Sequence, residues 1–267
     1  MTTGNPGGVW AIGSAYERYV GRWSRLVARD FLGWLAVPAG RRWLDVGCGT
    51  GALSRTILEH GAPSTIVGID ASAGFVDHAR SLASDPRASF QVGDAQALPF
   101  EHAAFDAAVS GLVLNFVPDP ARMMGAMRRV VKPGGVAAVY VWDYAGEMQL
   151  MRYFWDVAAE LDPAARDLAE GLRFPLCRPG PLAELARAAG LDEVTTRSVD
   201  VATTFPDFDD YWTPFLGGQG PAPAYCMSLS EEHRATLRER LRAALPIRPD
   251  GSLALIARAW AVKGRAA

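Results

Sequence analysis

The chain is organised around one stretch, Trp43-Leu44-Asp45-Val46-Gly47-Cys48-Gly49-Thr50-Gly51. It begins as a short apolar run that ends beside an acidic residue, which is typical of a buried strand. Three glycines then alternate, and because glycine has no Cβ the backbone there can turn sharply and approach a ligand closely. Leu53, Ile57 and Leu58 follow on one face of a predicted helix. Strand, glycine-rich turn and helix together predict the crevice of a nucleotide-binding α/β sheet.

The glycine spacing is G-x-G-x-G and differs from the G-x-G-x-x-G of dinucleotide sites. A loop this tight suits a ligand without a pyrophosphate, such as a nucleoside that carries an amino-acid tail. Residues 44–51 match the first motif of the class I S-adenosylmethionine-dependent methyltransferases at every position, so the sequence resembles that family, in particular its type 11, ubiquinone/menaquinone-methyltransferase-like members. The resemblance implies a Rossmann-like, seven-stranded mixed sheet of order 3-2-1-4-5-7-6, flanked by helices, with strand seven antiparallel.

Two carboxylates follow later strands where this family would place them. Asp70 ends a predicted strand over 65–69, and a carboxylate there can accept hydrogen bonds from a ribose diol. The alternative is that Asp70 merely caps the next helix, although Ser72 is an equally good cap. Asp94 opens the stretch Asp94-Ala95-Gln96-Ala97-Leu98-Pro99-Phe100 after the third predicted strand, where the resemblance implies that it binds adenine together with the Ala95 amide. The same resemblance extends cofactor binding to further residues: Asp45, Gly47, Cys48, Gly49, Ala71 and Leu112.

The N-terminal part predicts a flexible tail over 1–13 and two helices over 14–36. In the family that the chain resembles, such helices cover the cofactor, with tyrosines near the methyl group and an arginine near the methionine carboxylate. Arg22 is the candidate for that carboxylate, because an arginine can grip a carboxylate with two hydrogen bonds. Tyr19 is a candidate for the substrate pocket. The alternative is a helix that only packs on the sheet edge.

The detailed resemblance covers about 41–142, the predicted cofactor-binding core, and beyond it only the layout is similar. Within the core, Lys132-Pro133-Gly134-Gly135 predicts a tight turn into a strand over 136–142. Two segments, 143–178 and 206–229, are predicted to be insertions that cover the substrate, and the Gly/Pro-rich part of the second, 216–225, is predicted to be irregular. Aromatic side chains in these segments could line a pocket or fill the core beneath, and the candidate pocket residues are Tyr144, Trp155, Trp212 and Tyr225.

No residue is a convincing general base, which methyl transfer needs only when the acceptor must lose a proton. Asp143 and Tyr144, directly after the fifth predicted strand, are the best-placed catalytic candidates. The cysteines and histidines show no metal-ligand spacing, so no metal is expected. The predicted function is methyl transfer from S-adenosylmethionine to a small-molecule acceptor by in-line displacement.

Composition sets the remaining limits. The 267 residues could form one large domain or two small ones, and 49% hydrophobic residues are enough to bury a sizeable core. The resemblance implies a single methyltransferase domain over 1–267. A net charge of −2 without a basic run argues against a nucleic-acid partner. Three scattered cysteines, no secretory signal and no long apolar run favour the cytoplasm and no membrane span. The oligomeric state is open.

Two alternatives to methyl transfer remain. One is a protein that binds S-adenosylmethionine but does not methylate with it, or has no catalytic activity. The other is a nicotinamide oxidoreductase, which the glycine spacing and the lack of a Tyr-x-x-x-Lys set disfavour.

Overall fold

The computed structural model describes residues 21–217 and 220–267, so Tyr19 and the predicted tail lie outside the described residues. The chain divides into two compact units. The core unit comprises Ser24–Val141, Leu176–Val199 and Ala259–Ala267. The insertion unit comprises the described residues of 1–23, Trp142–Pro175 and 200–258, and it therefore includes most of the first predicted insertion and the described part of the second. The single-domain description stays a prediction.

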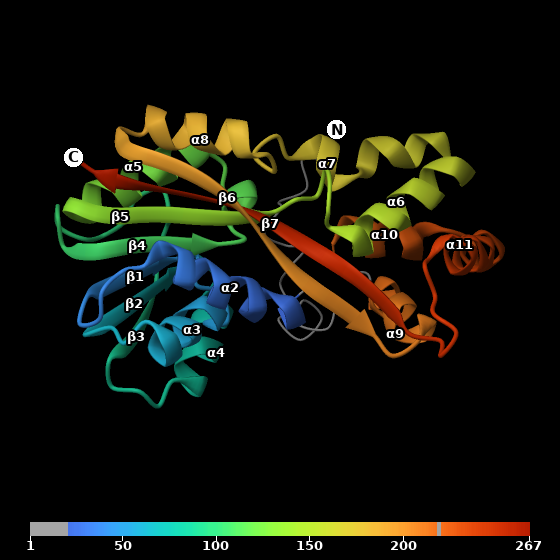
Figure 1. Cartoon of the computed structure of the whole chain (residues 1–267), viewed down its shortest axis with the longest axis horizontal. Coiled ribbons are helices and arrows are strands. Elements are labelled where there is room, and N and C mark those ends of the chain that lie inside the picture. Colours follow the sequence, from blue (N-terminus) through green and yellow to red (C-terminus); the bar gives the residue numbers. More distant parts are fainter. Residues whose placement is uncertain (1–20, 218–219) are drawn as a thin grey trace. The chain divides into compact units, whose positions relative to one another are not determined.

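Seven strands form one mixed sheet in the order β3-β2-β1-β4-β5-β7-β6, which confirms the predicted order (Figure 1). Parallel pairing joins β1 to β2 and β4, β2 to β3, and β4 to β5. The strands are β1 (Arg42–Val46), β2 (Thr65–Asp70), β3 (Ala88–Val92), β4 (Phe105–Gly111), β5 (Val131–Trp142), β6 (Leu191–Phe205) and β7 (Leu253–Ala266). Because parallel strands end at one edge, the carboxyl ends of β1 to β4 lie together.

Helices cover both faces of the core unit's part of the sheet, α3 and α4 on one face and α5 and α8 on the other (Figure 1). Met123 and Met127 of α5 are fully buried and share one apolar cluster with Leu44 of β1 and Leu182 of α8. The methionine stripe of α5 therefore fills the core. The helices are α2 (Arg22–Leu35), α3 (Ala52–His60), α4 (Ala73–Leu82), α5 (Pro120–Val130) and α8 (Pro179–Ala188), with a 3₁₀ turn, η3 (Leu114–Phe116).

The fifth strand begins earlier than predicted. Val131 already pairs with Phe105, and pairing resumes at Val136 with Ala107, so residues 132–135 leave the ladder as a bulged excursion. Gly134 has φ +74° in this excursion. The predicted start of the strand at residue 136 is therefore wrong, and the turn over 132–135 lies within a strand that has already begun.

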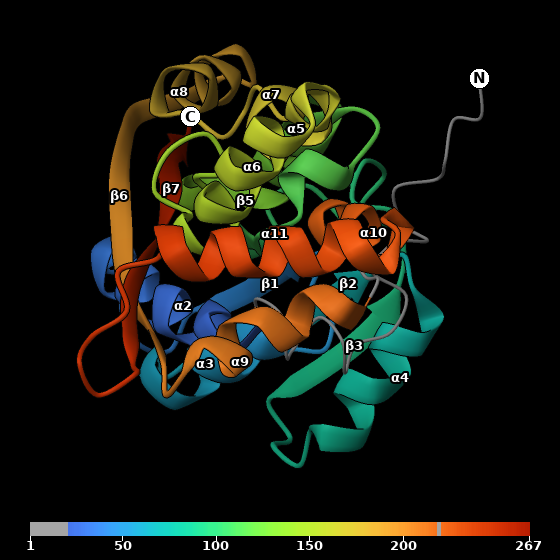
Figure 2. The same cartoon turned by 90° about the vertical axis from the view of Figure 1, so that its right-hand side faces the viewer.

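The insertion unit is mainly helical. In it α6 packs against both α10 and α11 (Figure 2). The buried hydroxyl of Tyr211 on α9 donates to the carbonyl of Leu150 on α6 at 2.9 Å, which joins these two helices. The elements are α6 (Gln149–Leu161), η4 (Pro163–Leu168), α7 (Glu170–Arg173), α9 (Phe208–Trp212), η5 (Thr213–Gly217), α10 (Pro221–Ser228) and α11 (Glu231–Ala244).

The prediction that 216–225 is irregular is wrong for its second half, because α10 begins at Pro221. Proline is tolerated in the first turn of a helix, where its missing N–H has no partner to lose. Gly220 precedes the helix with φ +96°. The Gly/Pro content that suggested a loop is the start signal of a helix.

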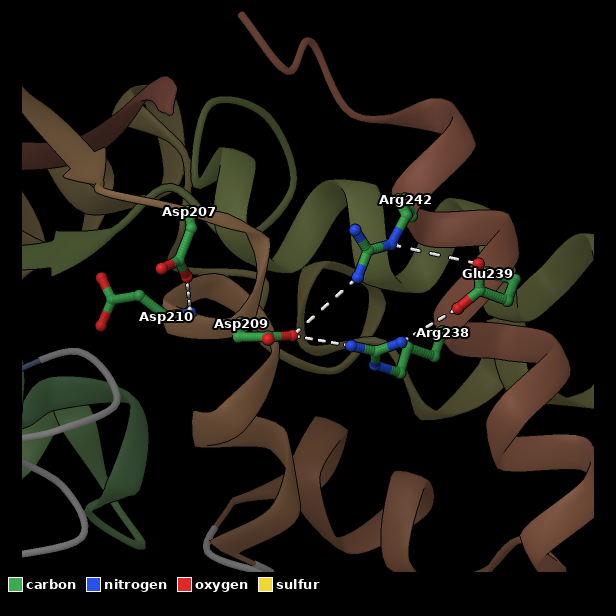
Figure 3. A network of polar contacts seen from close by, with 6 residues as sticks. All are labelled: Asp207, Asp209, Asp210, Arg238, Glu239 and Arg242. Carbon is green, nitrogen blue, oxygen red and sulfur yellow. Dashed lines mark hydrogen bonds and ion pairs between the residues drawn. The ribbon is translucent and has the colours of Figure 1, made fainter. Parts of the chain in front are cut away.

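An ion-pair network connects α9 and α11 on the surface of the insertion unit (Figure 3). Arg238 pairs with Asp209 at 2.7 Å and with Glu239 at 3.0 Å. The guanidinium of Arg242 lies 4.3 Å from the ring centroid of Phe208. Because the acidic partners are exposed, the network orients the two helices but contributes little to stability.

Among the helices of the described ranges, none combines the length and the apolar character needed to cross a membrane.

Candidate functional site

The turn after β1 is held in place by the end of β4. Gly47 has φ +72°, and a Cβ at this position would lie 2.6 Å from both Cγ atoms of Val113. The Gly47 and Cys48 amides donate to the carbonyl of Ile69 in β2 at 2.7 and 3.0 Å. Only glycine fits here without displacing Val113, which follows β4, because any other residue would meet both an unfavourable left-handed φ and a steric clash.

Gly49 is the open position of the same turn. Its φ is +52°, and a Cβ added there would find no protein atom within 4 Å. Its amide donates to Asp70 Oδ2 at 2.9 Å, and the other carboxylate oxygen of Asp70 accepts from the Ser72 amide at 2.8 Å. The half-buried carboxylate therefore fixes the turn while each oxygen keeps capacity for a second donor.

Ser72 is the N-cap of α4, because its hydroxyl accepts from the Phe75 amide at 3.4 Å. The alternative assignment of Asp70 as the cap is therefore not needed. Ala71, between these two residues, is exposed at the end of β2.

Asp45 lies beneath the turn and is 1% exposed. Ser54 on α3 donates to its Oδ2 at 2.6 Å, whereas its buried Oδ1 has no hydrogen-bond partner among the described residues. Burial raises the pKa of Asp45 to about 7, the Ser54 hydrogen bond opposes this shift, and the charge of Asp70 adds to it. A buried acceptor without a donor is costly and marks a place where a ligand donor would be stabilised.

The ends of β3 and β4 complete this edge of the core unit. Asp94 is exposed, and its Oδ1 accepts from the backbone and side-chain nitrogens of Gln96 at 2.8 and 3.2 Å. Hydrogen bonds from Gln96 hold the pKa of Asp94 below its usual value. Ala95 is half-buried beside it. Leu112 has φ +65°, a strained backbone for a non-glycine residue, and its amide donates to the Tyr140 carbonyl at 2.8 Å.

Cys48 contributes to this edge through its backbone. Its side chain is 6% exposed and packs with Val76, Ala79 and Phe90. Burial, with the charges of Asp45 and Asp70 adding to it, raises the pKa of the thiol far above its usual value, so the thiol is not a nucleophile.

Arg22 belongs to the insertion unit, where its Nη1 pairs with Asp210 at 3.0 Å. Its guanidinium lies 4.6 Å from the ring centroid of Trp23 and 4.7 Å from that of Phe205. Its buried Nε and Nη2 atoms have no hydrogen-bond partner among the described residues. These two nitrogens form one edge of the guanidinium, and such an edge suits a carboxylate.

The predicted pocket residues lie in two groups within the insertion unit. Trp155 and Tyr225 are in direct contact, with ring centroids 5.6 Å apart. Trp212 joins them through Phe215, which lies 6.2 Å from Trp212 and 4.5 Å from Phe154, the ring next to Trp155. Tyr144 is buried and pairs separately with Phe174 at 5.8 Å. Whether these rings line a pocket stays a prediction.

Asp143 holds the turn that follows β5. It is 5% exposed, and its Oδ2 accepts from the Glu147 amide at 3.1 Å. Its own amide donates to the Arg258 carbonyl at 2.9 Å. These contacts give Asp143 a structural role, and its catalytic role stays a prediction.

Sequence reasoning missed Ser54, Val113 and Glu170. Ser54 donates a hydrogen bond to Asp45, and the Val113 side chain leaves no room for a Cβ at Gly47. Neither residue belongs to a sequence motif that would indicate this role. Glu170 is 2% exposed, and its Oε2 accepts from Trp155 Nε1 at 2.5 Å. Nothing in the sequence between these two positions indicates the pair. Among the described residues, no group of His, Cys, Asp and Glu is arranged to hold a metal ion.

Comparisons with known proteins agree with this layout. A family model described as a methyltransferase domain matches residues 44–139. The chain is 35% identical over 188 residues to the 2-methyl-6-phytyl-1,4-hydroquinone methyltransferase of Synechocystis sp., covering 69% of this chain and 57% of that relative. It is 34% identical over 178 residues to the ubiquinone biosynthesis O-methyltransferase of Paracidovorax citrulli, covering 63% of this chain and 72% of that relative.

A solved structure shares the fold. The phosphoethanolamine N-methyltransferase 2 of Haemonchus contortus, in complex with phosphomonomethylethanolamine and S-adenosylhomocysteine, has a TM-score of 0.58 at 16% identity, over 100% of this chain and 58% of that chain. The chain spans 51% to 57% of the length of the first curated relatives that it matches.

Proposed function

The chain belongs to the class I S-adenosylmethionine-dependent methyltransferases, and on that premise we propose that it transfers the methyl group of S-adenosylmethionine to a phenolic or hydroquinone ring. The acceptor class is supported by the curated relatives, whose names describe methylation in hydroquinone and ubiquinone chemistry. The acceptor is thus a small molecule, and the proposed compartment is the cytoplasm. No disulfide joins Cys48, Cys177 or Cys226, which supports a reducing compartment.

One observation about the turn after β1 carries the proposal. A Cβ at Gly47 would clash with Val113, whereas a Cβ at Gly49 would meet no protein atom within 4 Å. A ligand can therefore approach the backbone at Gly49, where no side chain stands. Asp70 already fixes the Gly49 amide, so the turn is rigid before any ligand arrives. This arrangement suits an adenosyl group without phosphates.

In the proposal, each residue at this edge of the sheet binds a different part of the ligand. Asp70 accepts hydrogen bonds from the ribose hydroxyls with the capacity that Gly49 and Ser72 leave free. Asp94 accepts from the exocyclic amine of adenine through Oδ2, because Gln96 occupies Oδ1. The Ala95 amide faces a ring nitrogen.

The amino-acid tail of the ligand requires an acceptor for its ammonium group and a donor for its carboxylate. Asp45, in the core unit, supplies a buried oxygen without a partner, which suits the ammonium group. Arg22 stays the predicted ligand of the carboxylate, and its Nε and Nη2 edge in the insertion unit has the chemistry for that role. Each of these groups is short of hydrogen bonds among the described residues, so each fits the tail chemically.

When bound, S-adenosylmethionine supplies a methyl carbon that the neighbouring sulfonium makes electrophilic. The protein's part is to hold the acceptor atom in line with that carbon, and such positioning can lower a barrier by several kcal/mol, up to about 7–11. Where the accepting atom is a hydroxyl oxygen, the hydroxyl must also lose its proton, and a correctly placed base would add about 10²–10⁴-fold.

Two measurements test the proposal. A thermal-shift panel should show stabilisation by S-adenosylmethionine and S-adenosylhomocysteine and none by NAD(P)H. Incubation with methyl-labelled S-adenosylmethionine and a set of phenols and hydroquinones should transfer label to at least one ring. Stabilisation without transfer to any acceptor would favour a binding protein, and stabilisation by NAD(P)H alone would reject the proposal.

A further inference from the structure

Glu170 is a buried carboxyl group in the insertion unit that the proposed chemistry does not use. It begins α7 and is 2% exposed. Trp155 Nε1 donates to its Oε2 at 2.5 Å. Its Oε1 is buried and accepts no hydrogen bond from any described residue. One oxygen of this carboxyl group therefore has a hydrogen-bond donor, and the other has none among the described residues.

A buried acceptor oxygen of this kind needs a hydrogen-bond donor. Buried acceptors in folded proteins are nearly always hydrogen-bonded, because an unmatched one loses its water without a replacement. Burial raises the pKa of Glu170 to about 7, and the hydrogen bond from Trp155 and the charge of Arg173 act in the opposite direction. The group is thus held between its neutral and charged forms, and a ligand donor would stabilise the charged form.

Aromatic rings continue from the Trp155 side of this carboxyl group. The Trp155 ring lies 5.6 Å from that of Tyr225 and 5.3 Å from that of Phe154. Phe215 stacks on Phe154 at 4.5 Å. Phe154 and Phe215 are fully buried and Trp155 is 5% exposed, so the surroundings of Glu170 on this side are aromatic and apolar and match a flat apolar molecule chemically.

The turn that carries Glu170 lies directly on the loop after β5. A Cβ at Gly171 would come within 2.7 Å of Ala145 Cα and 2.8 Å of the Tyr144 carbonyl, so α7 touches this backbone. The side chains on either side, Leu168 and Leu172, are 43% and 61% exposed. The short segment that holds Glu170 therefore reaches solvent on both sides of this residue.

We propose that Glu170 Oε1, with Trp155 holding the other carboxyl oxygen, accepts a hydrogen bond from a hydroxyl group of an aromatic acceptor. The identification of the bound molecule as the methyl acceptor rests on the proposed function, whereas the binding itself depends only on residues of the insertion unit. A neutral hydroxyl is favoured over an ammonium group because the nearby Arg173 charge opposes a second cation. A carboxylate ligand is disfavoured by Glu170 itself.

The test compares two probes that differ in one donor, para-propylphenol and para-propylanisole, with benzylamine as the cationic probe. Calorimetric titration of the full chain should show the phenol binding at least about ten-fold more tightly than the anisole, because a hydrogen bond to a charged acceptor commonly contributes that much. The inference is overturned if para-propylphenol does not bind detectably, if para-propylphenol and para-propylanisole bind with equal affinity, or if benzylamine binds most tightly.

Two variants assign the preference to Glu170. In Glu170→Gln, the Trp155 N–H donates to the amide oxygen and the amide NH₂ faces the ligand, so the ratio should fall to within about two-fold of unity. The double variant Glu170→Leu/Trp155→Phe removes both polar partners together, which limits the loss of stability, and should give the same result. Glu160→Gln, the same charge change at an exposed position of α6, is the matched control and should keep the native ratio.

Retention of the phenol preference in either folded variant would overturn the inference. A parallel titration with S-adenosylhomocysteine separates the two proposals. If S-adenosylhomocysteine fails to bind while the phenol preference follows Glu170, the proposed function fails and this site stands. If S-adenosylhomocysteine binds and the preference is absent, the proposed function stands and this site fails.

Discussion

Replacing Gly49 with alanine separates ligand binding from folding. A Cβ at Gly49 meets no protein atom within 4 Å, so the only cost to the folded state is the left-handed φ of +52°. That cost is about 1–2 kcal/mol for a residue with a Cβ. The added methyl group stands where the proposed adenosyl ligand approaches the turn. We therefore expect Gly49→Ala to unfold at slightly lower urea concentration and to lose at least about ten-fold in S-adenosylhomocysteine affinity, or about 1.4 kcal/mol.

Gly47→Ala is the contrasting change on the same turn. Its Cβ would lie 2.6 Å from two carbon atoms of Val113, and its φ is +72°. Overpacking adds about 1–3 kcal/mol to the cost of the backbone conformation, so the free energy of unfolding should fall by about 2–5 kcal/mol. Gly33→Ala, at an exposed position inside α2 with no atom near the new Cβ, should instead stabilise the protein by about 0.5–1 kcal/mol.

Urea titrations give the stability of each variant, and isothermal titration calorimetry with S-adenosylhomocysteine gives the affinity. Native affinity in Gly49→Ala would refute the reasoning, because it would mean that no ligand approaches the turn at its open position. Equal destabilisation by Gly49→Ala and Gly47→Ala would also contradict it.

Three further predictions concern single side chains. Asp94→Asn should weaken S-adenosylhomocysteine binding by about ten-fold while leaving the melting temperature unchanged, because Asp94 is exposed; a large loss of stability with native affinity would be inconsistent with adenine binding. Asp45 has its pKa raised from 3.8 to about 7, so its contribution to stability is present below about pH 4 and is lost as the pH rises towards 7, by up to about 1.4 kcal/mol per pH unit. Asp45→Asn should reduce the pH dependence of stability in urea titrations between pH 4 and 7, where the raised pKa of Glu170 adds a slope of the same sign, and an unchanged slope would argue against the raised pKa of Asp45. Trp155→Phe should destabilise the protein by about 1–3 kcal/mol, because it leaves Glu170 buried without its hydrogen-bond donor. Tyr225→Phe loses only a 3.3 Å hydrogen bond to Asp162 and should leave the free energy of unfolding nearly unchanged. A larger loss of stability in Tyr225→Phe than in Trp155→Phe would contradict this account.

Much of the core unit could be predicted because local signals and tertiary structure agree there. The start of α3 at Ala52, the Ser72 cap of α4 and the strand that ends at Asp70 follow from short-range patterns. The order of the strands followed from the resemblance, and the structure confirms it. The loop glycines were predictable as a set. The sequence does not distinguish Gly47, where Val113 leaves no room for a Cβ, from Gly49, where a Cβ would meet no protein atom.

What the sequence could not predict depends on contacts between distant residues. Pro221 and Gly220 indicated a loop, yet they begin α10, whose Ala222 and Cys226 are buried. Glu170 looks like an ordinary surface glutamate beside two leucines that are in fact exposed, and only the fold brings it to Trp155. Arg22 was predicted as a carboxylate ligand, and the fold gives it Asp210, a partner 188 positions away.

A crystal structure with S-adenosylhomocysteine tests the central claim most directly. The account predicts the ribose hydroxyls within hydrogen-bonding distance of the Asp70 carboxylate, the adenine amine at Asp94, and ligand atoms in contact with the backbone at Gly49. An adenosyl group bound elsewhere on the chain, or no bound ligand at saturating concentration, would contradict it.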